Sequence, residues 1–149
     1  MAKTTIQYCT FTLEDLLFGI DVLDVQEVIR YQGITSVALA PDVVEGLINL
    51  RGEIITALDL RRRLLLAQRP ADRLPMNVVV RTADGPVSLL VDAIGDVIEA
   101  HDEDFEAPPE TVSGIARELI RGAYKLNGRL LLVLDIQRTV SLPEPAALR

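Results

Sequence analysis

The chain has 149 residues, 49% of them hydrophobic, and a formal net charge of −7, so it can bury the core of one domain or of two small halves. Nucleic-acid binding is disfavoured, because phosphate steering needs clustered cations and base stacking needs aromatic rings, which make up only 4% of the chain. With Cys9 as its single cysteine, the chain cannot form an internal disulfide.

The N-terminal residues show no targeting signal. The segment 1–8 lacks the apolar stretch of a signal peptide, and no apolar run approaches the ~18 residues of a membrane span. We therefore expect a cytoplasmic protein that does not insert directly into a membrane. Cys9 falls within a predicted strand and is interpreted as a small buried hydrophobe.

Short β-branched runs separated by turn residues predict strands along most of the chain. The first predicted hairpin consists of residues 8–13 and 17–22. Residues 22–30 carry apolar side chains at 22, 25, 28 and 29, which predicts a short amphipathic helix. Two further strands meet at Arg51-Gly52, and the segment 67–75 connects the two halves of the chain.

The second half continues with similar elements. Residues 77–80 and 87–91 form a predicted hairpin, and residues 112–120 a short helix. Asn127-Gly128 predicts a type I′ turn, and the continuous apolar character of residues 130–134 indicates a strand buried on both faces. The remaining segments are a solvated acidic loop in 101–113 and a loose tail at 141–149.

The chain contains an internal repeat. Residues 46–64 and 122–140 align at a constant offset of 76, and a fainter echo precedes each copy, at 25–29 and 94–98. A solenoid needs about three or more copies, so two copies indicate a pseudo-symmetric pair of subdomains with a groove between them. The identical pairs are Gly46/Gly122, Leu50/Leu126, Gly52/Gly128, Leu58/Leu134, Asp59/Asp135 and Arg62/Arg138.

The sequence offers no catalytic or metal site. His101 is the only histidine and lies in the acidic segment, and one Cys plus one His cannot supply the about four ligands of a zinc site. No glycine-rich phosphate-binding motif is present. Asp59 and Asp135 are interpreted as helix caps, and Arg61–Arg63 as a solvated helical turn. No cofactor is expected, and the chain is predicted to act by contact with other proteins.

Several motifs carry a family resemblance. The most specific is VEGLINLRGEII at 44–55, closed by LDLR at 58–61; FGIDV at 18–22, VQEV at 25–28, VD at 91–92 and GRL at 128–130 accompany it. In this order and spacing they resemble the CheW family, the coupling proteins of bacterial chemotaxis. The resemblance runs from about Tyr8 to Val140. Thr56 stands where the family often has proline.

The resemblance implies an all-β fold of two five-stranded SH3-like β-barrels related by a pseudo-twofold, with short helices. We expect one CheW-like domain over 1–149, with subdomains at about 8–66 and 77–140. The resemblance also implies a non-enzymatic adaptor. Such a protein bridges the cytoplasmic tip of methyl-accepting chemotaxis receptors to the regulatory domain of the histidine kinase CheA, in membrane-associated arrays.

Carried onto this sequence, the resemblance also implies two contact sites. In the repeat, Val25 corresponds to Ile94 and Val28 to Val97, which favours a shared seam, although core and groove positions look alike in sequence. The turn at Arg51 does not require arginine, since the equivalent residue is Asn127, so a partner contact is expected there. The receptor-binding residues are Val25, Glu27, Val28, Arg51, Ile94 and Val97, and the kinase-binding residues are Gly46 and Asn49.

Two alternatives stay open at this point. A CheW-like adaptor of a non-flagellar chemosensory pathway would have the same sequence features. A small β-barrel ligand-binding or hydrolytic protein would instead need a deep polar pocket that holds His101 or several acids with perturbed pKa values.

Overall fold

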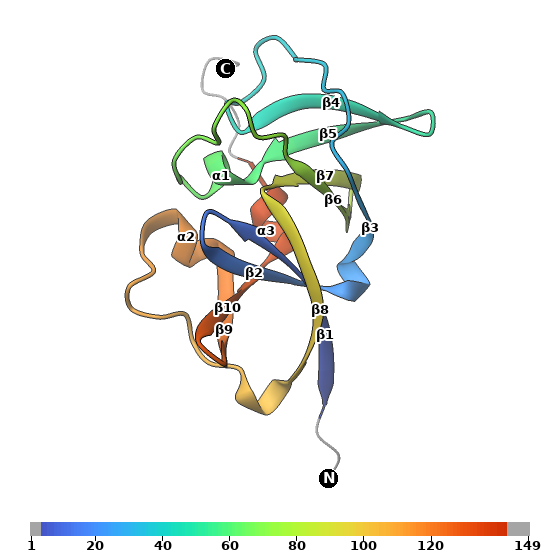
Figure 1. Ribbon diagram of the computed structural model, residues 1–149. Coiled ribbons are helices and arrows are strands. Elements are labelled where there is room, and N and C mark those ends of the chain that lie inside the picture. The colour runs from blue at the N-terminus through green and yellow to red at the C-terminus, as the bar shows by residue number, and fades with distance from the viewer. Residues whose placement is uncertain (1–3, 143–149) are drawn as a thin grey trace.

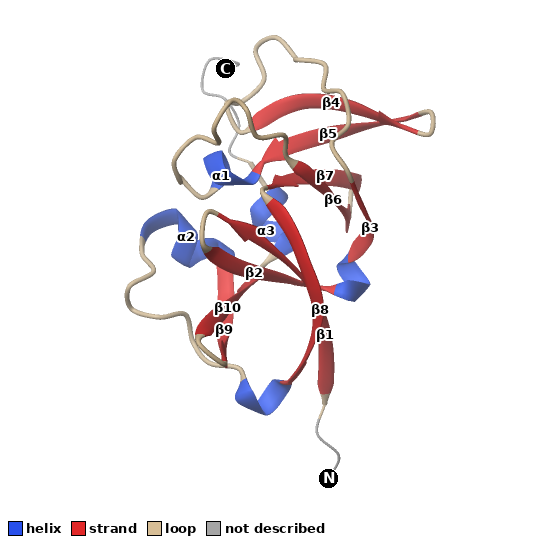
Figure 2. Cartoon of the chain, viewed as in Figure 1, coloured by secondary structure: helices blue, strands red, loops and turns tan. Residues whose placement is uncertain are grey.

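The chain folds into two β-sheets stacked one on the other, with short helices beside them (Figures 1 and 2). The computed structural model describes residues 4–142, so most of the predicted tail 141–149 lies outside the described residues. The described strands are β1 Thr5–Leu13, β2 Leu16–Asp21, β3 Val25–Ile29, β4 Val44–Leu50, β5 Glu53–Asp59, β6 Met76–Thr82, β7 Gly85–Val91, β8 Ala93–His101, β9 Ile120–Leu126 and β10 Arg129–Leu134. The helices are α1 Leu60–Arg63, α2 Gly114–Leu119 and α3 Ile136–Val140, with 3-10 helices η1 Val22–Asp24 and η2 Asp102–Asp104.

The two sheets have equivalent strand orders. Sheet 1 runs β8-β1-β2-β10-β9, and sheet 2 runs β3-β6-β7-β5-β4. Read in these orders, β8 corresponds to β3, β1 to β6, β2 to β7, β10 to β5 and β9 to β4. Equivalent strands are thus always five places apart in the chain order. Both sheets contain a parallel pair, β2–β10 in sheet 1 and β5–β7 in sheet 2. The predicted all-β fold with two sets of five strands is confirmed, and closure of each set into a barrel stays a prediction.

The sheets do not follow the two halves of the sequence. Residues 22–91 contribute every strand of sheet 2, whereas sheet 1 combines the N-terminal hairpin β1–β2 with β8, β9 and β10. Phe11 pairs with Ile94 and Phe18 with Leu132. The subdomain boundaries expected from the repeat, 8–66 and 77–140, therefore do not coincide with the sheets.

One hydrophobic core is shared by both sheets. Phe11 and Phe18 of sheet 1 have stacked rings with centroids 5.8 Å apart, and they belong to the same buried cluster as Val78 and Leu89 of sheet 2. A smaller cluster lies within each sheet. Each sheet therefore buries one face against the other in this shared core.

Residues 22–30 form a 3-10 turn and a strand, so the predicted helix is wrong. The apolar spacing fits a helical period, but burial along β3 alternates, with Val25, Glu27 and Ile29 less exposed than Gln26 and Val28. β-Branched residues favour strands, and β3 pairs with β6. Local periodicity cannot reveal that tertiary partner.

The two-residue β9–β10 hairpin is confirmed, but its turn is not of the predicted type I′. A type I′ turn needs positive φ at both central residues. Among the described residues this occurs in the equivalent β4–β5 turn, where Arg51 has φ 51° and Gly52 has φ 90°. In the β9–β10 turn only Gly128 is positive, at 82°.

The predicted helix caps are confirmed. Asp59 accepts a hydrogen bond from the backbone N–H of Arg61 at 3.1 Å, and Asp135 accepts one from the backbone N–H of Arg138 at 3.0 Å. Each carboxylate satisfies an N–H group that the first helical turn leaves unpaired. The predicted helix at 112–120 is present as α2.

Candidate partner-binding surface

The aliphatic residues expected at the receptor groove lie on β3 and β8, which are equivalent edge strands of the two sheets. Val25 and Ile94 are half-buried and pack against the shared core. Val28 and Val97 are 36% and 58% exposed. The structure thus separates positions that look alike in sequence: the first pair supports the core, and the second pair is available to a partner.

Arg51 and Glu27 form an ion pair that joins the tip of the β4–β5 hairpin to β3. The side chain of Arg51 is 70% exposed and that of Glu27 is 22% exposed. A left-handed backbone costs a non-glycine residue about 1–2 kcal/mol, so turn geometry does not account for arginine at this position. Two of the predicted receptor-binding residues are therefore in contact on an accessible edge.

Gly46 and Asn49, the predicted kinase-binding residues, have local structural roles. A Cβ atom on Gly46 would lie 2.2 Å from Thr35 O, because the segment after β3 crosses β4 there. Asn49 Oδ1 accepts a hydrogen bond from the Gly52 N–H at 2.9 Å in the hairpin turn. Gly46 is buried and Asn49 is exposed, so only Asn49 offers a side chain to a partner.

Gly46→Ala is expected to lower the free energy of unfolding by about 1–3 kcal/mol, as overpacking does, because the new methyl group meets backbone atoms that cannot move aside. Gly33→Ala is the matched control, since a Cβ there meets nothing within 4 Å. The control should leave stability unchanged or slightly raised. Urea unfolding of both variants tests this, and equal stability of the two would contradict the packing role of Gly46.

Arg62 and Arg138, which are equivalent in the two copies of the repeat, also have a local structural role. Arg62 Nη1 donates to Asp42 O at 3.1 Å, and Arg138 Nη1 donates to Glu118 O at 3.3 Å. The four residues form two equivalent pairs at the repeat offset. The two identical arginines therefore make the same local contact in each copy of the repeat. Partner recognition is expected where the copies differ, as at Arg51.

A buried ionic network joins the two sheets, and it was missed in the sequence. Asp92 lies where the chain crosses from β7 to β8, with its side chain 4% exposed. Arg61 Nε and Arg69 Nε donate to Asp92 Oδ1 at 2.9 and 3.1 Å. The Glu14 N–H, in the β1–β2 turn, donates to Asp92 Oδ2 at 2.7 Å. One carboxylate thus holds α1, the segment 64–75 and the N-terminal hairpin together.

The electrostatics of this network favour its charged form. Burial by itself raises the pKa of Asp92, but hydrogen bonds from Arg61 and the Glu14 N–H, with the charges of Arg61 and Arg69, hold that pKa below its usual range. Hydrogen bonding to Asp92 raises the pKa of Arg61. The pair is therefore ionised at neutral pH.

The prediction of a solvated turn at Arg61–Arg63 is wrong. Arg61 is 5% exposed at its side chain, and Arg63 Nε donates to Thr139 O at 2.8 Å. The cause is tertiary, because the following segments fold over α1. The available signals were the VD motif that contains Asp92 and the difference between Arg61 and its repeat equivalent Gln137, but no local pattern pairs Arg61 with Asp92.

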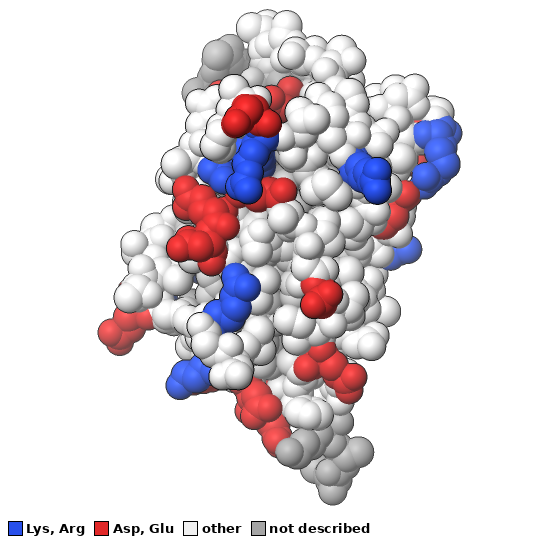
Figure 3. All heavy atoms as spheres, viewed as in Figure 1, with Lys and Arg blue, Asp and Glu red and all other residues white. Residues whose placement is uncertain are grey.

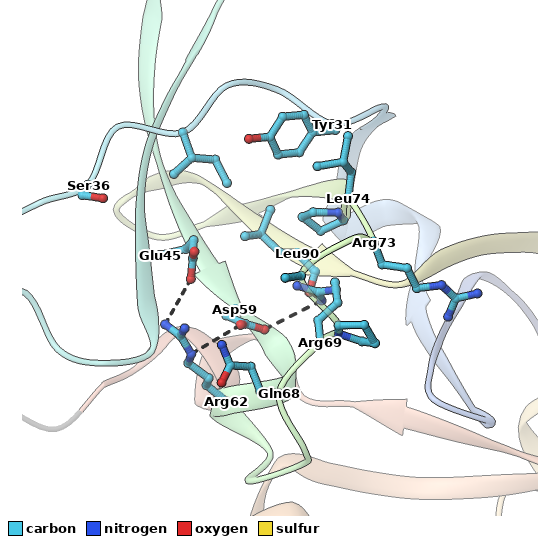
Figure 4. A pocket seen from close by; sticks show the side chains of 14 residues that line it. Tyr31, Ser36, Glu45, Asp59, Arg62, Gln68, Arg69, Arg73, Leu74 and Leu90 are labelled. Carbon is cyan, nitrogen blue, oxygen red and sulfur yellow. Dashed lines mark hydrogen bonds and ion pairs between the residues drawn. The ribbon is translucent and has the colours of Figure 1, made fainter.

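A polar pocket of about 300 Å³ opens between the segments 31–36 and 68–75 (Figure 4). Four of its five charged residues are paired with one another, and the fifth, Arg73, points away from it. Arg62 Nη1 lies 3.0 Å from Glu45 Oε2, and Arg69 Nη2 lies 3.8 Å from Asp59 Oδ1. These pairs already satisfy the charges that would orient a small ligand.

A second hollow, of about 470 Å³, lies beside His101. Its other lining residues are Glu99, Ala100, Glu103, Asp104, Glu106, Tyr124, Lys125 and Leu126, which include no serine, threonine or cysteine nucleophile. His101 Nδ1 lies 3.4 Å from Thr5 Oγ1. This geometry gives no support to the hydrolase alternative.

The described residues form neither a basic surface on the face drawn in Figure 3 nor a cluster suited to a metal ion. On the face drawn in Figure 3, cations stand in small separate groups among acidic residues and form no continuous basic surface. Within residues 4–142, no cluster of three or more His, Cys, Asp or Glu side chains could hold a metal ion, and no helix is long and apolar enough to cross a membrane.

Comparison with known proteins places this geometry in a family. Residues 7–144 match the model of the CheW-like domain. The chain is 34% identical over 142 residues to the chemotaxis protein CheW of Treponema pallidum, covering 93% of this chain and 84% of that protein. It is 32% identical over 140 residues to CheW of Klebsiella aerogenes, covering 94% and 84%.

A solved structure agrees with these relatives. The crystal structure of the scaffolding protein TtCheW from Thermoanaerobacter tengcongensis superposes with a TM-score of 0.84 at 28% identity, covering 93% of this chain and 94% of that one. The family model, the relatives and the fold all coincide over most of the chain. The chain belongs to the CheW family of chemotaxis scaffold and adaptor proteins, which are not enzymes.

Proposed function

We propose that this protein couples methyl-accepting chemotaxis receptors to the histidine kinase CheA. It does so from the cytoplasm, where it is recruited to membrane-associated receptor arrays. Family membership supports the proposal, together with a surface on this chain that suits a partner. The observation that carries it is the β3 edge, where the exposed Arg51 is held against Glu27 beside the accessible Val28.

The receptor-binding surface consists of β3 with the tip of the β4–β5 hairpin, and of β8 as its equivalent on sheet 1. A receptor helix presents apolar anchors at i, i+3, i+4 and i+7. Val28 and Val97 offer exposed apolar contacts, and Val25 and Ile94 form the half-buried floor below them. Glu27 and Arg51 add charges that can specify register.

The kinase-binding surface is proposed on the β4–β5 hairpin, where Asn49 lies. Asn49 is exposed, and Ile54 on the neighbouring strand is 61% exposed. Gly46 contributes by permitting the close crossing at Thr35, which sets the path of β4. The partner of this face is the regulatory domain of CheA.

Arg51→Ala is expected to weaken receptor binding by about 2 kcal/mol, roughly thirtyfold, if the guanidinium becomes desolvated in the complex. Stability should change by about 0.5 kcal/mol or less, because the side chain is exposed in the free protein. A melting curve and a titration with a receptor cytoplasmic fragment measure the two effects separately.

Arg73→Ala is the matched control, because Arg73 is an exposed arginine that points away from the neighbouring pocket (Figure 4). It should change neither quantity. If Arg51→Ala instead lowers stability by several kcal/mol, or binds receptor as the control does, then Arg51 is not a contact residue.

A further inference from the structure

The β9–β10 turn places an Asn-Gly dipeptide at an exposed tip. Both Asn127 and Gly128 are exposed, and a Cβ added at Gly128 would meet nothing within 4 Å. A glycine after asparagine leaves the next backbone nitrogen sterically open. We propose that Asn127 is a site of spontaneous deamidation, a modification that does not depend on the proposed coupling function.

The structure singles out Asn127 among the three asparagines of the chain. Asn49 is held by its hydrogen bond from the Gly52 N–H. Asn77 is fully buried, and its Oδ1 accepts a hydrogen bond from Ser88 Oγ at 2.7 Å. The Asn127 amide has no hydrogen-bond partner among the described residues. Only this side chain is free to turn onto the following peptide.

The equivalent turn shows what protects an attacking nitrogen. In the β4–β5 turn, the Gly52 N–H is engaged by Asn49 Oδ1 at 2.9 Å. The residue at the position equivalent to Asn49 is Lys125, which carries no acceptor for the Gly128 N–H. The two hairpins therefore share a fold but differ in whether the turn nitrogen is capped.

The chemistry uses only the chain and water. Gly128 N attacks Asn127 Cγ, and the new C–N bond closes a five-membered succinimide as the side-chain amide nitrogen leaves as ammonia. The proton lost from the Gly128 nitrogen leaves with that ammonia. Water then opens the ring at either carbonyl, which gives aspartate or isoaspartate. No group is oxidised or reduced, and one further negative charge appears at neutral pH.

The test is incubation of the folded full-length chain at neutral pH and physiological temperature, followed by peptide mapping with mass spectrometry. The expected result is conversion of the Asn127 peptide to aspartate and isoaspartate forms, while the Asn49 and Asn77 peptides keep their amides. An Asn127 peptide that keeps its amide, or three peptides that convert at similar rates, would overturn the proposal.

Arg51→Asn provides an internal comparison, because it puts the same dipeptide into the capped turn. The introduced asparagine should convert about fivefold more slowly than Asn127 in the same molecule. This is the rate ratio expected if the reaction must first break one typical hydrogen bond at the turn nitrogen. In urea-unfolded chain the two sites should convert at equal rates. If the two asparagines convert at equal rates in the folded chain, the hydrogen bond between the Gly52 N–H and Asn49 does not slow deamidation, and the proposed reason for the difference is wrong.

Discussion

Residues 1–74 expressed alone are expected to be unfolded, although they contain a complete copy of the repeat. In this fragment β1 and β2 lose their partners β8 and β10, and β3 and β5 lose β6 and β7. What remains is two isolated hairpins, β1–β2 and β4–β5, and the unpaired strand β3, and a two-stranded hairpin is marginally stable at best in water. The fragment also splits the shared core.

Circular dichroism and amide-proton NMR test this expectation. Residues 22–91 are the matched fragment, because all five strands of sheet 2 pair within them. That fragment should retain a strand signal that 1–74 lacks, and mixing 1–74 with 75–149 should restore the native spectrum. A cooperatively folded 1–74 would contradict the strand pairing described here.

Asp92→Asn is expected to lower the free energy of unfolding by about 3–5 kcal/mol, because it leaves Arg61 buried without its counter-ion. Both side chains are almost fully buried, at 4% and 5% exposure. The uncharged amide also binds the Arg69 guanidinium and the backbone N–H of Glu14 less strongly than the carboxylate does. Chemical denaturation measures the loss.

The same substitution should change the dependence of stability on pH. The folded-state pKa of Asp92 is lowered, so the folded protein binds this proton less readily than the unfolded chain does. The stabilisation is therefore complete above the ordinary carboxyl pKa of about 4 and is lost as pH falls through the lower folded value. The stability gap between the native protein and Asp92→Asn should narrow in that window.

Asp96→Asn serves as the control, since Asp96 is an exposed aspartate four residues along the chain, on β8. Its effect should stay within about 0.5 kcal/mol. A gap that persists unchanged at acid pH, or a loss at Asp96 as large as that at Asp92, would mean that the Arg61–Asp92 pair does not stabilise the fold as described.

The repeat made the strand content and the hairpins predictable, because its identical residues are those that local geometry demands. Gly46 and Gly122 leave room for a crossing backbone, and Asp59 and Asp135 cap helices. These requirements act within a few residues along the chain or at a repeated contact. The pairing of the N-terminal hairpin with strands from the second half of the chain leaves no such pattern in the sequence. β1 would show the same alternation of apolar and polar residues whichever strand lay beside it.

The candidate site was predictable only in part, for a similar reason. An exposed valine and a core valine carry the same letter, so Val28 and Val25 were separated only by their packing. The network at Asp92 depends on arginines that fold over it from α1 and the segment after it. A run of charged residues does not show which of its side chains point toward the protein interior. The inward orientation of Arg61 follows from tertiary structure alone.

The pairing of the first hairpin with the last strand also sets an order of events during synthesis. Sheet 2 can form once Val91 has left the ribosome, whereas β1 and β2 must wait for β10, which ends at Leu134. Synthesis from the end of β2 at Asp21 to the end of β10 takes about 6–23 seconds at about 5–20 residues per second. During that time Phe11 and Phe18 lack their final neighbours. The N-terminal hairpin is made first and paired last, so its apolar side chains wait longest for their partners during synthesis.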